Sequence, residues 1–514
     1  MFKGSNMTKE STKWVVSFLV VVCCTFVSCQ KPDQMLFKAA ENGSSADILA
    51  AINKGADVNA RDAGGYTALI YAAMYNEDPD VVKTLIDVGS DLNAKDTYNA
   101  TGEGATALIH AAWKNKNPYV TKALLDAGAD IYEEDGDGHS AFMKAAAFNT
   151  NPAVVEALIA AGADVSEEDK RGYTALAHAA ESNTNPDVIR VLVGAGANVN
   201  ARDGEGKAEV IQAEGNEKNE HEGLDMSLLE SIFPTDPRGE EKTILMHAAE
   251  KNRNPAVLKA LIDAGADVNT QIAGDMTALM FATHNYYNMA GVIKVLTDAG
   301  ADVNAMAGGL TPLEYIDRRG GSDPDAMLTL IYAGANVDVM YTDLPVAYGK
   351  TMLMWNIEHN QEPYVIEAII ASSSDVNVKG LGNATALMYA AEYSSNLSVV
   401  KTLLAAGADV WARDDDGMTA LMYAAAFNTD PDVIKTLAAV GADVNAQDDL
   451  GQTALMYAAA NNENADVLYS LLAAGADVEA HDNDGNKAAD HLESREDKIF
   501  RYTSAYRKMK KLLQ

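Results

Sequence analysis

A 34-residue period runs along this chain and restricts it to one kind of architecture. The segment Thr-Ala-Leu-x-x-Ala-Ala recurs with its threonine at Thr385, Thr419 and Thr453, which are 34 residues apart. A second segment, Gly-Ala-Asp-Val-Asn, follows and stands complete at Gly55–Asn59, Gly265–Asn269, Gly300–Asn304 and Gly441–Asn445. Self-similarity at this period indicates a stacked repeat array, whose function lies on an extended surface rather than in one deep pocket.

One unit, residues 417–448, shows what each repeat is expected to form. Leu421, Ala424 and Ala425 lie at i, i+3 and i+4, on one face of a short helix. Asn428 is expected to end that helix, because asparagine tolerates the left-handed backbone conformation found at helix ends. The unit therefore begins with a helix of about ten residues, too short to be stable alone in water.

A second helix is predicted to follow in each unit. Asp430 is expected to cap it and Pro431 to occupy its first position, while Gly441 ends it. The same Asn-x-x-Pro segment recurs at Asn76–Pro79, Asn115–Pro118, Asn149–Pro152, Asn183–Pro186, Asn252–Pro255, Asn360–Pro363 and Asn428–Pro431. These repetitions predict a series of helix–turn–helix units that bury their alanine-rich faces against one another.

These motifs resemble the ankyrin repeat family over roughly residues 34–492. Thr311-Pro312-Leu313 retains the proline usual in that family, whereas most copies here carry alanine. The Asn-x-x-Pro segment also makes the loop between the helices one residue longer than usual. The resemblance implies an all-α solenoid of about thirteen or fourteen units, with paired antiparallel helices, projecting β-turn fingers and a concave protein-binding face.

The charge and the cysteines exclude several classes of function. With a formal net charge of −34, the chain is not expected to bind nucleic acid through its phosphates. A basic protein partner is favoured, although many of the carboxylates are simply the recurrent aspartates of the turns. Cys23, Cys24 and Cys29 are the three cysteines of the chain, so disulfides, zinc–thiolate sites and cysteine catalysis are excluded after residue 29.

The N-terminus has the pattern of an export signal. Three lysines precede an apolar segment, residues 14–27, that is too short to span a bilayer and suits the core of a signal peptide. Phe26-Val27-Ser28-Cys29 is similar to a bacterial lipobox, with Phe26 in place of the usual leucine. Residues 1–28 are therefore predicted to be a signal peptide, Cys29 to be lipidated, and residues 29–35 to be a linker. A secreted form and an uncleaved anchor are the alternatives.

The rest of the chain is predicted to be one array with an interruption. Ankyrin repeats are expected over residues 36–203 and 243–483, with a degenerate repeat or an acidic insertion over residues 204–242 between them. Residues 484–514 are expected to form a capping repeat with a basic helix. Two turn fingers are predicted to be longer than the others, near residues 97–104 and 339–349, because the threonine spacing there is 39 and 40 residues.

One segment of the sequence resembles a metal-binding motif. Residues 133–138 resemble a calcium loop, but Lys144 stands where a bidentate glutamate is needed. The histidines do not have metal-ligand spacing, and His110, His178 and His247 share one repeat position. No nucleophile elbow, phosphate-binding glycine loop or His-Glu-x-x-His motif is present in the sequence. No cofactor, no metal and no enzymatic activity are expected.

The shared repeat position gives the candidate binding site. It carries aromatic or polar rings in most repeats, on a helix face different from the alanine face, and further rings follow four residues later in several of them. Clustered exposed aromatic residues are typical binding anchors. The residues predicted to contact a partner are Tyr71, Tyr75, His110, Trp355, Tyr389, Tyr393, Tyr423, Phe427 and Tyr457. The alternative is that each ring packs on its neighbour as a leucine would.

The functional prediction is a non-enzymatic scaffold, monomeric and anchored by lipid in a bacterial cell envelope. It would bind a protein partner on its concave face and turn fingers, and membrane contact would occur only through the N-terminal lipid. One alternative is the recognition arm of an envelope enzyme or secreted effector, and another is a structural tether between envelope layers. The sequence does not identify the partner.

Overall fold

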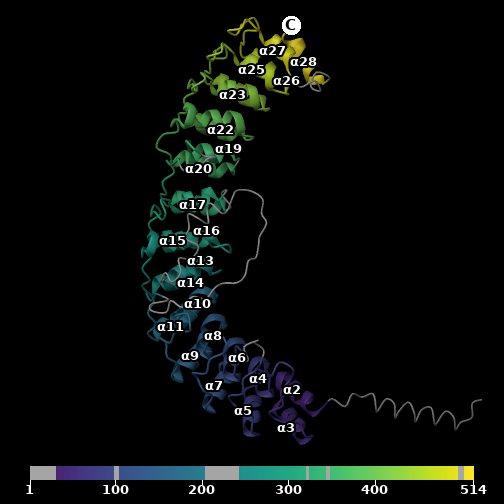
Figure 1. Ribbon diagram of the computed structural model, residues 1–514, viewed down its shortest axis with the longest axis vertical. Coiled ribbons are helices and arrows are strands. Elements are labelled where there is room, and N and C mark those ends of the chain that lie inside the picture. Colours follow the sequence, from purple (N-terminus) through teal and green to yellow (C-terminus); the bar gives the residue numbers. More distant parts are fainter. Residues whose placement is uncertain are drawn as a thin grey trace, which may run out of the picture. The chain divides into compact units, whose positions relative to one another are not determined.

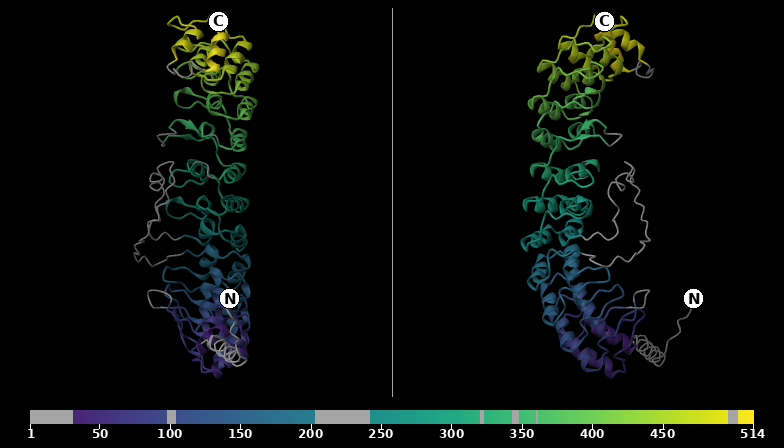
Figure 2. Two further views of the ribbon diagram at one scale, coloured as in Figure 1. Left: turned by 90° about the vertical axis from the view of Figure 1, so that its right-hand side faces the viewer. Right: turned by 60° about the vertical axis from the view of Figure 1, so that its left-hand side comes forward.

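The computed structural model describes residues 31–97, 104–202, 242–319, 323–342, 348–359, 361–495 and 503–514. It divides into unit 1, Met1–Ile272, and unit 2, Ala273–Gln514. Within each unit, short paired helices lie one pair above the next (Figures 1 and 2). The predicted all-α repeat architecture is confirmed.

Unit 1 contains six helix pairs among its described residues. They are α2 (Pro32–Asn42) and α3 (Ser45–Asn53), α4 (Ala68–Tyr75) and α5 (Pro79–Asp87), α6 (Ala107–Lys114) and α7 (Pro118–Asp126), α8 (Ala141–Phe148) and α9 (Pro152–Ala160), α10 (Ala175–Ser182) and α11 (Pro186–Gly194), and α13 (Ile244–Lys251) and α14 (Pro255–Asp263).

Unit 2 contains seven helix pairs, two 3-10 turns and one short hairpin among its described residues. They are η1 (Ala273–Asp275), α15 (Ala278–Ala282) and α16 (Met289–Asp298), α17 (Pro312–Arg318) and α18 (Pro324–Tyr332), β1 (Met340–Tyr341) and β2 (Lys350–Thr351), α19 (Met352–Glu358) and α20 (Pro363–Ser372), η2 (Leu381–Asn383), α21 (Ala386–Tyr393) and α22 (Leu397–Ala405), α23 (Ala420–Phe427) and α24 (Pro431–Ala439), α25 (Ala454–Asn461) and α26 (Ala465–Ala473), and α27 (Ala488–Ser494) and α28 (Ser504–Leu512).

The helix boundaries follow from local side-chain chemistry. Thr67 precedes α4, and its hydroxyl accepts a hydrogen bond from the Ile70 amide at 3.3 Å. The second helix of most pairs begins with proline, and Asp430 caps α24 by accepting from the Asp432 amide at 2.9 Å. Gly441 follows α24 with a φ of +99°, a left-handed conformation that glycine adopts without steric penalty.

Stacking of like helices builds the core. In most layers the first helix packs against the first helices of its neighbours, as α4 does on α2 and α6, and the second helices do the same, as α5 does on α3 and α7. Ala72, Ala73, Ala111 and Ala112 are completely buried at these contacts. Because their side chains are small, the helix axes can approach closely, and burial across layers replaces the stability that each short helix lacks.

A ladder of asparagines joins consecutive layers. The side-chain nitrogen of Asn149 donates to the carbonyls of Ala112 and Asn115 in the preceding layer, at 2.9 and 2.8 Å, while its oxygen accepts from the Asn151 amide at 3.0 Å. Equivalent pairs of bonds are made by Asn76, Asn115, Asn183, Asn252, Asn428 and Asn462.

The ladder corrects the expected role of Asn428. This residue has φ −85° and ψ 129°, an extended rather than a left-handed conformation. The first helix therefore ends because the asparagine side chain accepts from the Asp430 amide, two residues on, and donates to two carbonyls of the preceding layer, not because its backbone is left-handed.

The interruption of the array falls within one turn finger. The prediction for residues 204–242 lies outside the described residues, apart from Lys242. On either side of it, α10 packs directly on α13 and α11 on α14, and Arg202 forms a β-bridge with Thr243 as Glu168 does with Thr174. No described helix lies between these two layers.

Two other fingers are longer than the rest, as the spacing predicted. In an ordinary finger the Asp62 amide donates to the Tyr66 carbonyl, four residues on, whereas the Asp96 amide donates to the carbonyl of Ala105, nine residues on. The second long finger contains the antiparallel pair of β1 and β2. Residues 98–103 and 343–347, at the tips, lie outside the described residues.

The first helix begins earlier than predicted. Residues 32–35 were expected in a linker but belong to α2, because Pro32 occupies its first turn and Asp33 accepts a hydrogen bond from the Asp57 amide at 2.9 Å. The predicted signal peptide and Cys29 lie outside the described residues. No helix of the described chain is both long and apolar enough to cross a membrane.

The last layer ends the asparagine ladder with an arginine. Arg495 donates from Nη1 to the Asn462 carbonyl at 2.6 Å, the kind of acceptor that each ladder asparagine reaches. The basic helix α28 packs on α26 and α27, and Lys510 pairs with Glu493 at 2.7 Å while Lys508 pairs with Asp466. This arrangement is a charged cap on the final layer.

Candidate functional site

The repeat position predicted to form a binding column lies in the first helix of each layer. In several layers its side chain bonds to an aspartate in the turn finger that precedes the helix. We call this position the inner column and call its acidic partner the finger aspartate. Asp62 accepts through Oδ1 from the amides of Gly64 and Tyr66, both at 2.9 Å, and through Oδ2 from the Tyr71 hydroxyl at 2.8 Å. The aspartate thus fixes the turn and the ring together.

The same tie recurs with other donors. Tyr423 donates to Asp414 at 2.7 Å and Tyr457 to Asp448 at 2.6 Å. In other layers a histidine or lysine contacts the finger aspartate instead of a tyrosine. The pairs are His110–Asp96 at 2.6 Å, Lys144–Asp135 at 2.9 Å, His178–Asp169 at 3.1 Å and His491–Asp482 at 2.8 Å. A position that accepts such different side chains is held by this hydrogen bond.

Burial separates the predicted residues into three sets, which are buried, half-buried and exposed. His110 and Trp355 are only 3% and 4% exposed, so the expectation that they face a partner is wrong. The ring of Tyr66, from the preceding finger, covers His110 at 5.6 Å between centroids, and His359 stacks on Trp355 at 3.8 Å. Four further inner-column residues are half-buried: Tyr71, Tyr389, Tyr423 and Tyr457.

The exposed rings lie in the last turn of the first helices, and we call them the exit aromatics. Tyr75, Tyr393 and Phe427 are 49%, 39% and 53% exposed. Trp113 and Phe148 in unit 1 are also exposed, and the sequence prediction missed both. Their spacing in the sequence could have identified them, because each of these rings lies three or four residues after an inner-column residue.

In unit 1 the exit aromatics already hold a lysine. The Trp113 and Phe148 rings are 6.1 Å apart, and Lys114 Nζ lies 4.5 Å from the Trp113 centroid and 6.0 Å from that of Tyr75. These distances are within the range of cation–π attraction. The row of rings is therefore suited to positively charged side chains.

In unit 2 the rings line a groove of about 520 Å³. Its aromatic residues come from α21, α23 and α25, and its acidic residues from α19, α21 and the finger before α23. The lining consists of Lys350, Glu358, Leu381, Gly382, Ala384, Met388, Tyr389, Glu392, Tyr393, Asp414, Asp415, Asp416, Met418, Tyr423, Phe427 and Tyr457. Five of the predicted partner-binding residues, Tyr389, Tyr393, Tyr423, Phe427 and Tyr457, thus meet at one place.

Charge in this groove is strongly one-sided. Five carboxylates line it, and its single cation, Lys350, is already paired with Glu358. The same Lys350 Nζ lies 5.7 Å from the Tyr389 ring centroid. The lining offers carboxylates and aromatic faces, which suits recognition of a cation.

Burial and negative charge shift the pKa values of the lining groups upward. Burial, with the nearby Glu358 carboxylate, raises the pKa of Glu392. Burial also raises the pKa of Tyr389, Tyr393 and Tyr423 above the usual tyrosine value, assisted by neighbouring carboxylates. The tyrosine hydroxyls therefore remain protonated donors. A positive charge bound in the groove would be stabilised by the carboxylates around it.

Three relatives match short parts of the chain. Mitochondrial disaggregase of Bos taurus is 34% identical over 87 residues, 17% of this chain and 13% of that protein. The protein of the same name from Homo sapiens is 35% identical over 81 residues, 16% and 11% of the two chains. A putative ankyrin repeat protein of Fowlpox virus (strain NVSL) is 43% identical over 63 residues, 12% of each chain. The matches span only 11–13% of these relatives.

A family model covers most of the chain. The model, described as ankyrin repeats in three copies, matches residues 8–96, 36–135, 108–203, 219–315, 318–414 and 387–482. Repeats of this kind generally mediate protein–protein interaction. The 34-residue layers, the finger aspartates and this match agree, and the chain belongs to the ankyrin repeat family.

Proposed function

We propose that this protein is a non-enzymatic scaffold that binds a basic segment of a protein partner in the groove of unit 2. The observation that carries the proposal is the composition of that groove, in which five carboxylates and five aromatic rings surround one lysine that is already paired. Lysine or arginine side chains of a partner would supply the missing positive charge.

Lys350 illustrates how such a side chain is held. It pairs with Glu358 and lies near the faces of Trp355 and Tyr389, at 6.0 and 5.7 Å from the centroids. The next two layers offer the same chemistry without a resident cation, through Glu392, Asp416 and the ring of Phe427. Each cation–π contact contributes about 0.5–2 kcal/mol, depending on how dry the site is.

The charge of the whole chain supports the same class of partner. A net charge of −34 raises the local concentration of basic proteins and accelerates their association. This attraction is screened by salt over about 8–10 Å. Specific recognition would then come from the rings, and steering from the carboxylates.

The test uses the full chain and labelled oligo-lysine and oligo-arginine peptides, with oligo-glutamate as a probe of opposite charge. Glu392→Gln combined with Asp416→Asn should weaken binding of the basic peptides by at least about tenfold, if each lost contact is worth about 1 kcal/mol. The control is Asp325→Asn with Glu362→Gln, two exposed carboxylates of the second helices in the same unit.

Both double variants remove two negative charges, so they separate the groove from the general field of the protein. An equal loss of affinity in the two variants would show that the peptides respond to net charge alone. Equal binding of oligo-glutamate by the wild-type chain would remove the basic partner from the proposal.

We further propose that the array is exported and anchored through a lipid on Cys29. The support is the sequence pattern before Cys29 together with the confinement of all cysteines to residues 1–29. Radiolabelled lipid should be incorporated into the wild-type chain in a bacterial host, and Cys29→Ala should lose the label and leave the membrane fraction. Cys24→Ala is the matched control and should keep the label. A labelled Cys29→Ala variant would contradict the assignment.

A further inference from the structure

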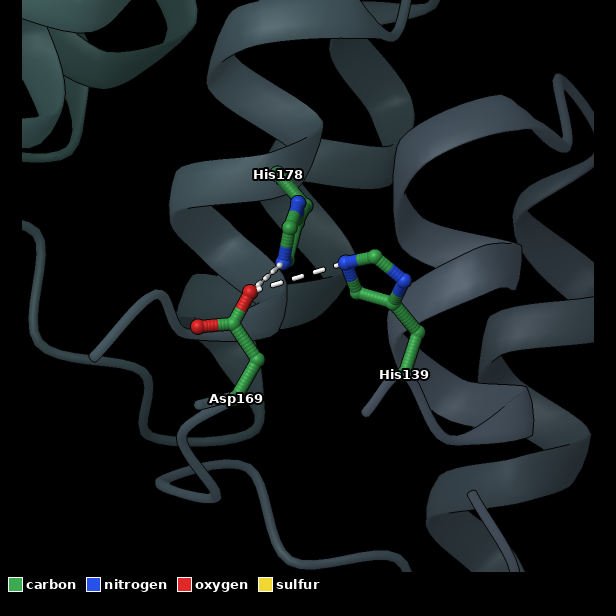
Figure 3. A group of neighbouring side chains, drawn as sticks. All are labelled: His139, Asp169 and His178. Atoms are coloured by element: carbon green, nitrogen blue, oxygen red, sulfur yellow. Dashed lines mark hydrogen bonds and ion pairs between the residues drawn. The ribbon is translucent and has the colours of Figure 1, made fainter. Parts of the chain in front are cut away.

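Two imidazole rings face one buried carboxylate between consecutive layers of unit 1. His139 lies in the turn finger before α8, Asp169 in the finger before α10, and His178 within α10 itself. Figure 3 shows one nitrogen of each ring directed toward the same oxygen of Asp169. This cluster lies outside the groove of unit 2.

Neighbouring layers show how the cluster arises. The last residue of one finger touches the inner-column residue of the next layer, in the pairs Tyr66–His110 and Tyr173–His247, with centroids 5.6 and 5.0 Å apart. The pair His139–His178 has the same contact at 5.0 Å. A histidine in place of the finger tyrosine therefore adds a second nitrogen ligand beside the finger aspartate.

We propose that His139, Asp169 and His178 form a binding site for a divalent transition-metal ion, specifically Zn²⁺. Asp169 Oδ2 lies 3.1 Å from His178 Nε2 and 3.5 Å from His139 Nε2. Ligand atoms of all three residues lie within 4.8 Å of one another.

The two separations between Asp169 and the histidines match what zinc requires. Zinc bonds to nitrogen and carboxylate oxygen are about 2.0–2.1 Å, so ligand atoms at the corners of a tetrahedron are about 3.3–3.4 Å apart. The two measured distances fall on either side of that value. Two histidines and one carboxylate leave the fourth position for water, as in zinc sites with three protein ligands.

The carboxylate is held ready to bind a cation. Asp169 is buried, and its Oδ1 accepts from the amides of Arg171 and Tyr173 at 2.8 and 2.9 Å. These bonds leave Oδ2 directed at the histidines. Burial opposes ionisation, but the hydrogen bonds from His139, His178 and the two amides hold the pKa of Asp169 well below its usual range.

The groups around the cluster are compatible with a metal. His139 Nδ1 lies 3.5 Å from Asp135 Oδ1, so a metal on Nε2 would leave the ring proton on Nδ1, facing a carboxylate that orients the ring. Asp135 is also paired with Lys144 at 2.9 Å. Arg171 Nε lies 3.7 Å from Asp169 Oδ2 on an exposed side chain, which can swing into solvent when the metal binds.

A metal here would link two layers. His139 belongs to the finger that precedes α8, whereas Asp169 and His178 belong to the following repeat. Binding should therefore stabilise unit 1 as well as occupy the site, because a ligand that binds only the folded state shifts the unfolding equilibrium. That gives the test a readout besides metal content.

The experiment titrates Zn²⁺ into the chelator-treated full chain by calorimetry, with excess Mg²⁺ present to occupy exposed carboxylates. One tight equivalent is expected, together with a rise in the unfolding temperature of unit 1. Co²⁺ should give the visible absorption of a four-coordinate nitrogen and oxygen site.

The variants are chosen from residues that the array itself uses. His139→Tyr reproduces Tyr66 and Tyr173, and His178→Tyr reproduces Tyr71, which keeps its bond to a finger aspartate. Each should weaken Zn²⁺ binding by at least about tenfold, comparable to or more than the loss of a supporting group, and leave the helical content unchanged. His481→Ala, at an exposed histidine of unit 2, should have no effect.

Two results would overturn the proposal. One is a wild-type chain with no saturable zinc binding beyond that of the His139→Tyr/His178→Tyr chain. The other is a folded double variant that binds one zinc as tightly as the wild type. In either case the histidines serve only as hydrogen-bond donors to Asp169.

Discussion

Asn252 donates from its side-chain nitrogen to the carbonyl of Asn183 at 2.9 Å, although the two residues are 69 positions apart. The same bond joins Asn149 to Asn115 across 34 positions at 2.8 Å. The ladder thus continues without a gap past residues 203–241. The layers of α10 and α13 are direct neighbours, and Arg202 and Thr243, on either side of the additional residues, form a β-bridge.

Removing residues 208–242 should therefore leave the stack intact. The deletion joins Lys207 to Thr243 and produces the finger Arg-Asp-Gly-Glu-Gly-Lys-Thr, which follows the pattern Arg-Asp-Asp-Asp-Gly-Met-Thr of residues 413–419. A shorter connection loses less conformational entropy when the loop closes on folding. The free energy of unfolding of unit 1 should therefore stay the same or rise by up to about 2 kcal/mol. Urea unfolding measures this change. Loss of amide protection in α10 and α13 after the deletion would show that the removed residues form part of the core.

Replacing one ladder asparagine should strongly destabilise the fold. Asn462 donates to the carbonyls of Ala425 and Asn428 at 3.0 and 2.8 Å, and its oxygen accepts from the Asn464 amide. Asn462→Ala leaves two buried carbonyls without this donor and should destabilise unit 2 by about 2–4 kcal/mol. Asn461→Ala, at the neighbouring exposed position, is the matched control and should change stability by less than about 0.5 kcal/mol. Equal effects of the two substitutions would argue against the ladder as a source of stability.

The sequence was sufficient for the layers but not for the contacts between them. The 34-residue spacing predicted the helix pairs because each unit repeats one cap, one break and one glycine. The role of Asn428 was misassigned, since a ladder that joins Asn428 to Ala391 and Ser394 depends on neighbouring layers. The sequence within one unit does not contain that information.

The candidate sites show the same limit. The inner column was found from its repeat position, but the burial of His110 involves the ring of Tyr66 from the preceding finger, which the sequence of one unit does not contain. His139 and His178 are 39 residues apart and match no metal-binding motif, because their contact is made by stacking. The unit 2 groove likewise combines carboxylates of α19, α21 and the finger before α23 with rings of α21, α23 and α25.

The two kinds of aromatic position should respond differently to mutation. Tyr423→Phe removes the hydroxyl that donates to Asp414 and should lower the stability of unit 2 by about 1.5–3 kcal/mol, the usual range for a hydrogen bond to a charged group. Phe427→Ala removes an exposed ring and should leave stability nearly unchanged while weakening basic-peptide binding by at least about fivefold. Denaturant unfolding and peptide titration of both variants separate the effects. A Phe427→Ala variant that unfolds as easily as Tyr423→Phe would place that ring in the packing.

The pH dependence of unit 2 should contain a contribution from one buried acid. Asp317, in α17, accepts from the Tyr341 hydroxyl and from the Asn356 side chain at 2.7 Å. Burial raises its pKa to about 6, against the opposing effects of Tyr341, Asn356, His359 and Arg318. In the unfolded chain the same carboxyl has its ordinary pKa of about 3.9.

The sign follows from which state holds the proton more tightly. Because the folded pKa is the higher one, the stabilising contribution of Asp317 is complete below about pH 4 and is lost as pH rises through about 6. Over this window the contribution changes by about 3 kcal/mol, from about two pKa units at 1.4 kcal/mol each. Asp317→Asn has no ionisable group there, so the stability of the variant relative to wild type should rise by this amount between pH 4 and pH 7. The introduced amide can still accept from Tyr341 through its oxygen.

Urea unfolding of the full chain at several pH values between 4 and 7 measures the difference, with amide exchange in β1 and α19 to locate it. Asp325→Asn, at an exposed carboxylate of the following helix, removes the same charge and should give a nearly constant difference from wild type. Only the change with pH is compared, because the variant also alters the hydrogen bond to Asn356. A difference for Asp317→Asn that stays flat from pH 4 to pH 7 would mean that Asp317 ionises near its ordinary pKa, with Tyr341 and Asn356 compensating fully for its burial.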